Sequence, residues 1–206
     1  AIVAAAWLFA ALIGAFPFVI SKEIPNYINA FFETVSGFTT TGASILENVE
    51  VMSHGMLFWR SFTHFIRGMG FLVFVMAIIP NISDRSMHIM RAEVPGPVVG
   101  KLVPKIKDTA KILYIIYFCM TVVEIIMLIC GGMPAFDSVL LSFGSAGTGG
   151  FGIKCDSIAS YSPYCQWVIG VFMMLFGINF NVYFLLLIKH FKSAAKTSEM
   201  WCYLGI

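Results

Sequence analysis

Charged residues are scarce in this sequence. Its 206 residues include 13 Lys and Arg and 11 Asp and Glu, so that 12% are charged against 59% hydrophobic. The mean hydropathy is +0.87, whereas an ordinary soluble domain carries about 25% charged residues. This deficit argues against a typical soluble domain. It predicts an all-α protein that crosses a membrane several times, because helices satisfy their own backbone hydrogen bonds in lipid.

The cysteines also exclude one class of site. The five of them show no spacing typical of a zinc or other metal site. Cys155 and Cys165 lie in one predicted outward loop, where they would either pair in an oxidising compartment or remain thiols. We expect free thiols.

Four apolar runs are long enough to cross a bilayer core, which takes about 20 residues. They cover residues 2–20, 56–79, 112–129 and 164–188. Basic residues gather between the second and third runs and after the fourth: Arg85, Arg91, Lys101, Lys105, Lys107 and Lys111, then Lys189, Lys192 and Lys196. The positive-inside rule makes that side cytoplasmic. Topology therefore explains the basic clusters without a nucleic-acid partner.

Two Gly-centred loops lie 107 positions apart in two copies of one pattern. They read GFTTTGAS at residues 37–44 and GSAGTGGF at residues 144–151, and Gly70 and Gly177 repeat the same spacing. An internal repeat of this kind predicts the architecture. We expect two parallel units, each a span, a pore half-helix, a filter loop and a returning span, arranged as in potassium-channel-like pores and both starting on the cytoplasmic side.

The repeat predicts the following organisation. Residues 1–80 form the first unit with its filter at 39–43, 81–111 a cytoplasmic basic linker, 112–192 the second unit with its filter at 146–150, and 193–206 a cytoplasmic connection and the start of a further repeat. The half-helices, at 27–36 and 135–143, are too short to cross the bilayer. Because both ends of the chain lie in apolar sequence, we expect an internal fragment of a larger membrane protein.

The filter loops have the composition of a cation site. A loop rich in Thr and Gly exposes backbone carbonyls, which replace the water shell of an ion. The expected filter residues are Thr39, Thr40, Thr41, Gly42, Ala146, Gly147, Thr148 and Gly149. A half-helix that ends at the pore centre adds a partial negative charge. With no carboxylate in either loop, these oxygens suit a dehydrated monovalent cation. The alternative is a plain helix bundle in which Gly and Thr only allow close packing.

At this point the sequence resembles a known group, the Trk/Ktr/HKT superfamily of potassium transporters, most closely its bacterial TrkH-type branch. The matching segments are AFFETVSGFTTTGA at residues 30–43, FWRSFT at 58–63, and Pro95-Gly96-Pro97 with the basic run after it. The resemblance implies the second and third of four repeats around one pore, with K⁺ as the transported ion. It also implies that Gly42 and Gly149 are filter glycines that favour K⁺.

The resemblance further implies a gate, partners and a location. The expected gate is an intramembrane loop in the last span, formed by Gly177, Ile178, Asn179, Phe180 and Asn181. Expected partners are the lipid bilayer, a second copy in a homodimer, and a cytoplasmic nucleotide-binding regulatory subunit. The expected location is the cell inner membrane, as a multi-pass protein without a cofactor.

One face of the second span carries Arg60, His64 and Arg67 at helical spacing. This stripe either faces the pore or packs against other repeats. Glu33, the one acid of the first half-helix, is the expected partner of Arg60, because a lone buried charge is costlier than a paired one.

Other functions compete with a potassium channel. An ion-coupled Na⁺ or H⁺ symporter of the same fold stays open. A structural subunit would not need duplicated loops. An intramembrane serine hydrolase would use Ser145 with His64 or His54, but the spacing is not Gly-x-Ser-x-Gly and no acid is placed to orient either histidine. We therefore expect no enzyme activity.

Overall fold

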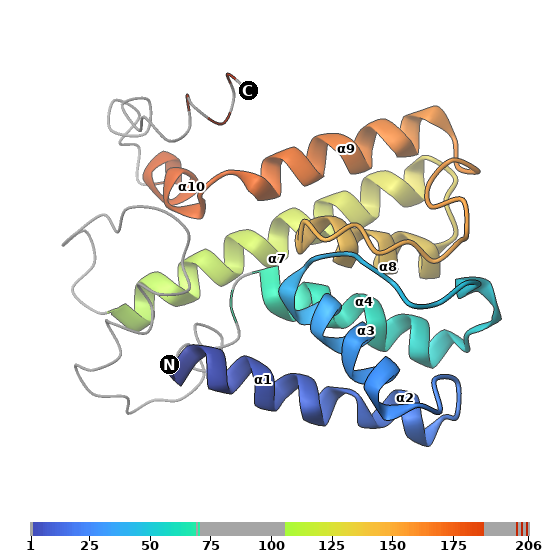
Figure 1. Cartoon of the computed structure of the whole chain (residues 1–206). Coiled ribbons are helices and arrows are strands. Elements are labelled where there is room, and N and C mark those ends of the chain that lie inside the picture. The colour runs from blue at the N-terminus through green and yellow to red at the C-terminus, as the bar shows by residue number, and fades with distance from the viewer. Residues whose placement is uncertain are drawn as a thin grey trace. The chain divides into compact units, whose positions relative to one another are not determined.

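The computed structural model describes residues 2–68, residue 70, residues 106–187 and residues 201, 203 and 205. The helices in these ranges are α1 (Ile2–Gly14), α2 (Phe16–Ile20), α3 (Tyr27–Thr39), the 3-10 turn η1 (Val49–Val51), α4 (His54–Gly68), α7 (Ile106–Cys130), α8 (Ala135–Ala146), α9 (Pro163–Gly177) and α10 (Phe180–Leu187) (Figure 1). Every regular element described is a helix, as the composition predicts. Most of the basic linker, the rest of the second span and residues 188–200 lie outside the described residues.

The chain divides into two compact units. The first comprises Ala1–Gly68 and Thr121–Met173, and the second comprises Met69–Met120 and Met174–Ile206. Each unit takes residues from both predicted repeats. Both filter loops belong to the first unit, and the predicted gate belongs to the second.

One helix in the described ranges is long and apolar enough to cross a bilayer by itself. It covers Lys111–Cys130 within α7, with a mean hydropathy of 2.5. Shorter apolar helices cover Ala4–Ile20, Ala135–Ala146 and Pro163–Gly177. The first apolar run bends at Ala15, because Pro17 in the first turn of α2 has no backbone N–H to bond the preceding turn.

Both half-helices are longer than the sequence predicts. The predicted ends were residues 36 and 143, whereas α3 ends at Thr39 and α8 ends at Ala146. Gly37 and Gly144 therefore lie inside helices and do not turn the chain. A Cβ atom at Gly37 would collide with the Thr63 hydroxyl, and one at Gly144 would lie 3.0 Å from the carbonyl oxygen of Phe151. These glycines allow close packing, which offsets their low helix propensity.

Helix α4 lies at the centre of the first unit. It packs against both α3 and α8, and the three helices lie side by side (Figure 1). Its buried side chains are mostly polar: Leu57, Arg60, Ser61, Thr63 and His64. An apolar seam on the same helix packs the rings of Phe62 and Phe65 against Phe143 of α8, with the Phe65 and Phe143 centroids 4.6 Å apart. The polar face of α4 is thus turned toward the ends of the two half-helices.

Candidate ion-conduction site

Each half-helix ends in a loop with an unusual backbone. In the first loop (residues 40–45), Thr40 and Gly42 have φ angles of 54° and 74°; in the second loop (residues 147–152), Thr148 and Gly150 have φ angles of 54° and 73°. A positive φ is uncommon for threonine, which carries a branched Cβ. The same left-handed pair therefore occurs in both loops, separated by 108 positions.

The hydrogen bonds around the loops follow the same spacing. The Thr40 N–H donates to the carbonyl of Gly37, and the Thr148 N–H donates to that of Ser145. A second equivalent pair joins Thr41 N to Ser36 O and Gly149 N to Gly144 O. The geometry thus relates the loops by 108 positions, not by the 107 read from the sequence.

The 108-residue relationship already holds at the start of the half-helices, because α3 begins at Tyr27 and α8 begins at Ala135. At their ends, Gly147 is in the right-handed region, with φ −77° and ψ −6°, and corresponds to Thr39, the last residue of α3. The structural counterpart of Gly42 is consequently Gly150, and the expected superposition of Gly42 on Gly149 is wrong within the loops. Sequence spacing missed it because the identical glycines offered an ungapped match.

The two loops touch. A Cβ atom built on Gly42 would collide with the carbonyl oxygen of Gly149. Among the described residues, the carbonyl oxygens of 40–42 and 148–150 accept no backbone hydrogen bond. The loops therefore bring two short rows of free carbonyl oxygens together at the C-terminal ends of α3 and α8, where helix carbonyls carry a partial negative charge.

The predicted filter residues differ in exposure. Thr39 and Ala146 are the last residues of their helices and not part of the loops. Thr39, Thr41 and Thr148 are exposed, while Ala146 and Gly147 are buried. Gly147 packs tightly, since a Cβ there would lie 2.6 Å from the His64 carbonyl oxygen. Gly150, which was not among the eight expected residues, is exposed.

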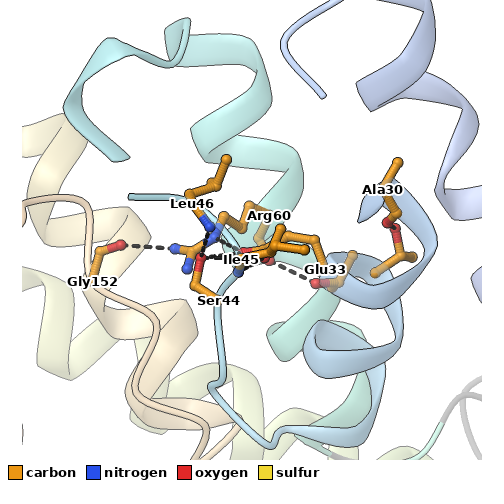
Figure 2. A network of polar contacts seen from close by, with 9 residues as sticks. Ala30, Glu33, Ser44, Ile45, Leu46, Arg60 and Gly152 are labelled. Atoms are coloured by element: carbon orange, nitrogen blue, oxygen red, sulfur yellow. Dashed lines mark hydrogen bonds and ion pairs between the residues drawn. The ribbon is translucent and has the colours of Figure 1, made fainter. Parts of the chain in front are cut away.

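A buried ion pair joins the two loops. Arg60 Nε lies 2.6 Å from Glu33 Oε1, and the exposed fractions of the two side chains are 3% and 0%. Glu33 also accepts hydrogen bonds from the Ser44 hydroxyl, at 3.0 and 3.2 Å, and from the Ile45 N–H, at 2.9 Å. Arg60 Nη1 donates to the carbonyl oxygen of Gly152 at 2.8 Å (Figure 2).

The residues of the stripe on α4 pack against aromatic rings. The guanidinium of Arg60 lies 3.6 Å from the ring centroid of Phe151, and His64, fully buried, stacks on the same ring. Arg67 lies over the ring of Trp7 in α1, at 5.0 Å. All three cationic or titratable residues of the stripe therefore have aromatic neighbours.

A buried acid that the sequence reasoning missed lies behind the second loop. Glu124 of α7 is 0% exposed and accepts a hydrogen bond of 2.5 Å from the hydroxyl of Ser145. A lone acid in an apolar run is costly in lipid and marks a functional or structural partner. Ser145 is thus bonded to a carboxyl group and to helix carbonyls, not to His64 or His54 as a hydrolase would require.

Between α8 and α9, Tyr161 donates a hydrogen bond of 2.8 Å to Asp137 in the first turn of α8. Burial, together with this hydrogen bond and the nearby carboxylate, raises the pKa of Tyr161 above its usual range. The phenol therefore stays a donor at physiological pH. Cys155 and Cys165 are free thiols.

The fourth apolar run breaks where a gate was expected, but over a shorter stretch. Helix α9 ends at Gly177 and α10 begins at Phe180, so that Ile178 and Asn179 alone are non-helical. Phe180 and Asn181, expected in the loop, belong to α10. The Asn179 carbonyl accepts from Val182 N at 2.9 Å and starts the new helix. A Cβ on Gly177 would collide with the Tyr203 hydroxyl, which donates to Met174 O.

Among the described residues, no group of three or more His, Cys, Asp or Glu side chains is arranged to hold a metal ion. The two loops themselves contain backbone carbonyls and threonine hydroxyls, whose oxygen atoms are ligands for hard cations.

The chain is similar to a family of cation transporters. Residues 1–201 match the family model described as "TrkH: Cation transport protein". The chain belongs to the TrkH family. It is 39% identical over 185 residues to the Trk system potassium uptake protein TrkH of Salmonella typhimurium, covering 88% of this chain and 38% of that protein. It is 33% identical to the Trk system potassium uptake protein TrkG of Escherichia coli K12, with the same two coverages.

A solved structure is also similar to this TrkH-family chain. The crystal structure of the potassium transporter TrkH from Vibrio parahaemolyticus matches with a TM-score of 0.71 and 29% identity, over 89% of this chain and 36% of that one. The chain thus spans less than two fifths of the length of these relatives. The resemblance to the Trk group is confirmed, and a family of transporters argues against the serine hydrolase.

Proposed function

We propose that this segment contributes two of the filter loops of a potassium-conducting membrane subunit in a K⁺ uptake system. The observation that carries the proposal is the contact of the two loops, where Gly42 lies against the carbonyl oxygen of Gly149. Two rows of free carbonyls at helix C-termini form half of a cage able to replace the hydration shell of a monovalent cation. The names of the relatives, Trk system potassium uptake proteins, support K⁺ as that cation.

In this proposal the K⁺ site is formed by backbone atoms. The contributing residues are Thr40, Thr41, Gly42, Gly147, Thr148, Gly149 and, by the 108-residue relationship, Gly150. Thr39 and Ala146 belong to the same filter and lie at the C-terminal ends of α3 and α8. The protein is multi-pass in the cell inner membrane, works as a homodimer, and binds a cytoplasmic nucleotide-binding regulatory subunit. The relatives' names as parts of a Trk system support an assembly of several components.

A gate in the last span completes the proposal. The break at Ile178 and Asn179 interrupts an apolar helix, and such irregular backbone at membrane depth is tolerated where it is buried in protein or lines a water-filled cavity. Ile178 and Phe180 supply the apolar side chains for a hydrophobic constriction. An ion-coupled symporter would use the same parts, and accumulation of K⁺ against its gradient, driven by Na⁺ or H⁺, would favour it.

The test uses the full-length protein that contains this segment, reconstituted in liposomes. Wild type is expected to carry K⁺ in preference to Na⁺. Gly42→Ser and Gly150→Ser should each lower the K⁺/Na⁺ flux ratio by about tenfold, equivalent to about 1.4 kcal/mol, because a side chain at positive φ shifts the carbonyls of the loop.

Gly132→Ser is the matched control. Gly132 also has a positive φ, 84°, but nothing lies within 4 Å of its added Cβ, and it sits in the turn between α7 and α8. It should cost similar backbone strain and leave the ratio unchanged. A wild type without preference for K⁺, or equal effects of all three substitutions, would contradict the proposal.

A further inference from the structure

We infer that the buried Glu33–Arg60 ion pair is a clamp that fixes the spacing of the two filter loops and thereby sets cation selectivity. This inference rests on the proposed function and names the residues that position its site. Glu33 holds the first loop through Ser44 and Ile45, and Arg60 holds the second loop through Gly152 (Figure 2).

The clamp holds equivalent places in the two loops. Ser44 lies two residues beyond Gly42, and Gly152 lies two residues beyond Gly150. The difference between 44 and 152 is 108, the same spacing that relates the left-handed residues and the loop hydrogen bonds. One ion pair therefore joins the same structural position of both copies. It couples the positions of the two loops, so that a shift of one loop displaces the other.

The chemistry of the clamp is directional. Glu33 acts as an acceptor for a hydroxyl and a backbone N–H, while Arg60 acts as a donor to a carbonyl. A buried ion pair is a poor device for stability, because an apolar pair of similar volume is often as stable. It is a good device for geometry, since hydrogen bonds to charged groups fix distance and angle. Carbonyl placement is what distinguishes cations in a filter.

The ring of Phe151 makes the clamp stiffer. The Arg60 guanidinium lies 3.6 Å from the ring centroid, and Phe151 itself is 2% exposed. The planar guanidinium is thus held by stacking on one side and by the carboxylate and the Gly152 carbonyl at its edge. Lysine has neither a planar charged group nor several N–H donors in a fixed arrangement. It is therefore not equivalent to arginine at this position.

The experiment measures the K⁺/Na⁺ flux ratio of the full-length protein in liposomes, at equal amounts of folded protein. Glu33→Gln and Arg60→Gln are expected to lower the ratio about tenfold, within the range of coupling between sites. The exchanged variant Glu33→Arg/Arg60→Glu should not restore it, because a carboxylate at 60 cannot donate to Gly152 and a guanidinium at 33 cannot accept from Ser44. Restoration by the exchange would show that charge pairing alone matters and would overturn the clamp.

Two further variants guard against loss of folding. Ser44→Ala removes one exposed hydroxyl that donates to Glu33 and is expected to lower the ratio about threefold, as one net hydrogen bond allows. Arg67→Gln is the matched control, because Arg67 lies on the same helix and contacts Trp7. An unchanged ratio in Ser44→Ala, or an equal fall in Arg67→Gln, would overturn the inference.

Amide hydrogen exchange separates this inference from the proposed function. Glu33→Gln should raise exchange in both loops, around Ile45 and around Gly152, although Glu33 touches the first loop directly and reaches the second only through Arg60. If exchange rises in both loops but wild type shows no K⁺ preference, the clamp stands and the proposed function fails. If K⁺ preference is present and exchange rises in the first loop alone, the clamp is wrong.

Discussion

The imidazole of His64 lies nearly parallel to the phenyl ring of Phe151, with their centroids 4.0 Å apart and their planes 11° from parallel. The same imidazole fills the space beside Gly149, where an added Cβ would collide with the ring. His64 is 0% exposed. The shape of the second loop is therefore set by a side chain from α4, and not by its own residues alone.

Gly149→Ala should accordingly destabilise the protein by about 1–3 kcal/mol, the usual cost of overpacking. The measurement is thermal unfolding of the full-length protein in detergent. Combining it with His64→Ala should cost less than the sum of the two single substitutions, because the smaller side chain removes the collision. Gly170→Ala is the control: nothing lies within 4 Å of its added Cβ in α9, and it should be neutral or slightly stabilising. Strict additivity of the pair would contradict this account.

Ser145→Ala should destabilise the protein by about 1–3 kcal/mol, since it leaves the buried carboxyl of Glu124 without its hydroxyl donor. Ser142→Ala, one turn earlier in α8, removes a buried hydroxyl that has no hydrogen-bond partner among the described residues. That control should be neutral or stabilising. The comparison of the two unfolding temperatures is the measurement, and equal losses would show that the contact between Ser145 and Glu124 is not what matters.

Removal of residues 177–181 should raise K⁺ flux if this segment is the barrier. Because the deletion shortens a membrane helix, the double substitution Ile178→Ala/Phe180→Ala provides a milder version that widens a hydrophobic constriction. Both variants are compared with wild type by K⁺ flux into liposomes. The elution volume in size-exclusion chromatography and the unfolding temperature show whether each variant is folded. A folded variant with wild-type or lower flux would remove this segment from the gate.

Much of the helical fold follows from simple sequence features. The length of apolar sequence predicts the helix in 112–129, and the predicted starts of the half-helices, residues 27 and 135, are those of α3 and α8. The predicted half-helix ends lie three residues before the observed ones, because Gly37 and Gly144 favour turns by propensity. Their role in the structure is to leave room for Thr63 and for the Phe151 backbone. These neighbours are distant in the sequence, so local sequence patterns do not predict them.

The site was predicted less completely than the fold. The ion pair of Glu33 with Arg60 was expected because a lone buried charge is costlier than a paired one, and the structure contains it. Its bonds to Ile45 and Gly152 involve backbone atoms, on which the sequence is silent. Glu124 was open to prediction as the one acid in an apolar span. The 108-residue spacing was not, because the glycines of the two loops also match without a gap at 107 positions.

The displacement of one residue between the loops has a consequence for the ion. With a spacing of 108, residues 39–41 of the first copy correspond to residues 147–149 of the second. Three threonines therefore correspond to Gly-Thr-Gly. One wall of the proposed passage thus offers three hydroxyl groups and the opposite wall offers one. A cation between them would feel unequal dipoles and rest nearer the threonine-rich wall. The duplicated motif would then form an asymmetric cation-binding site.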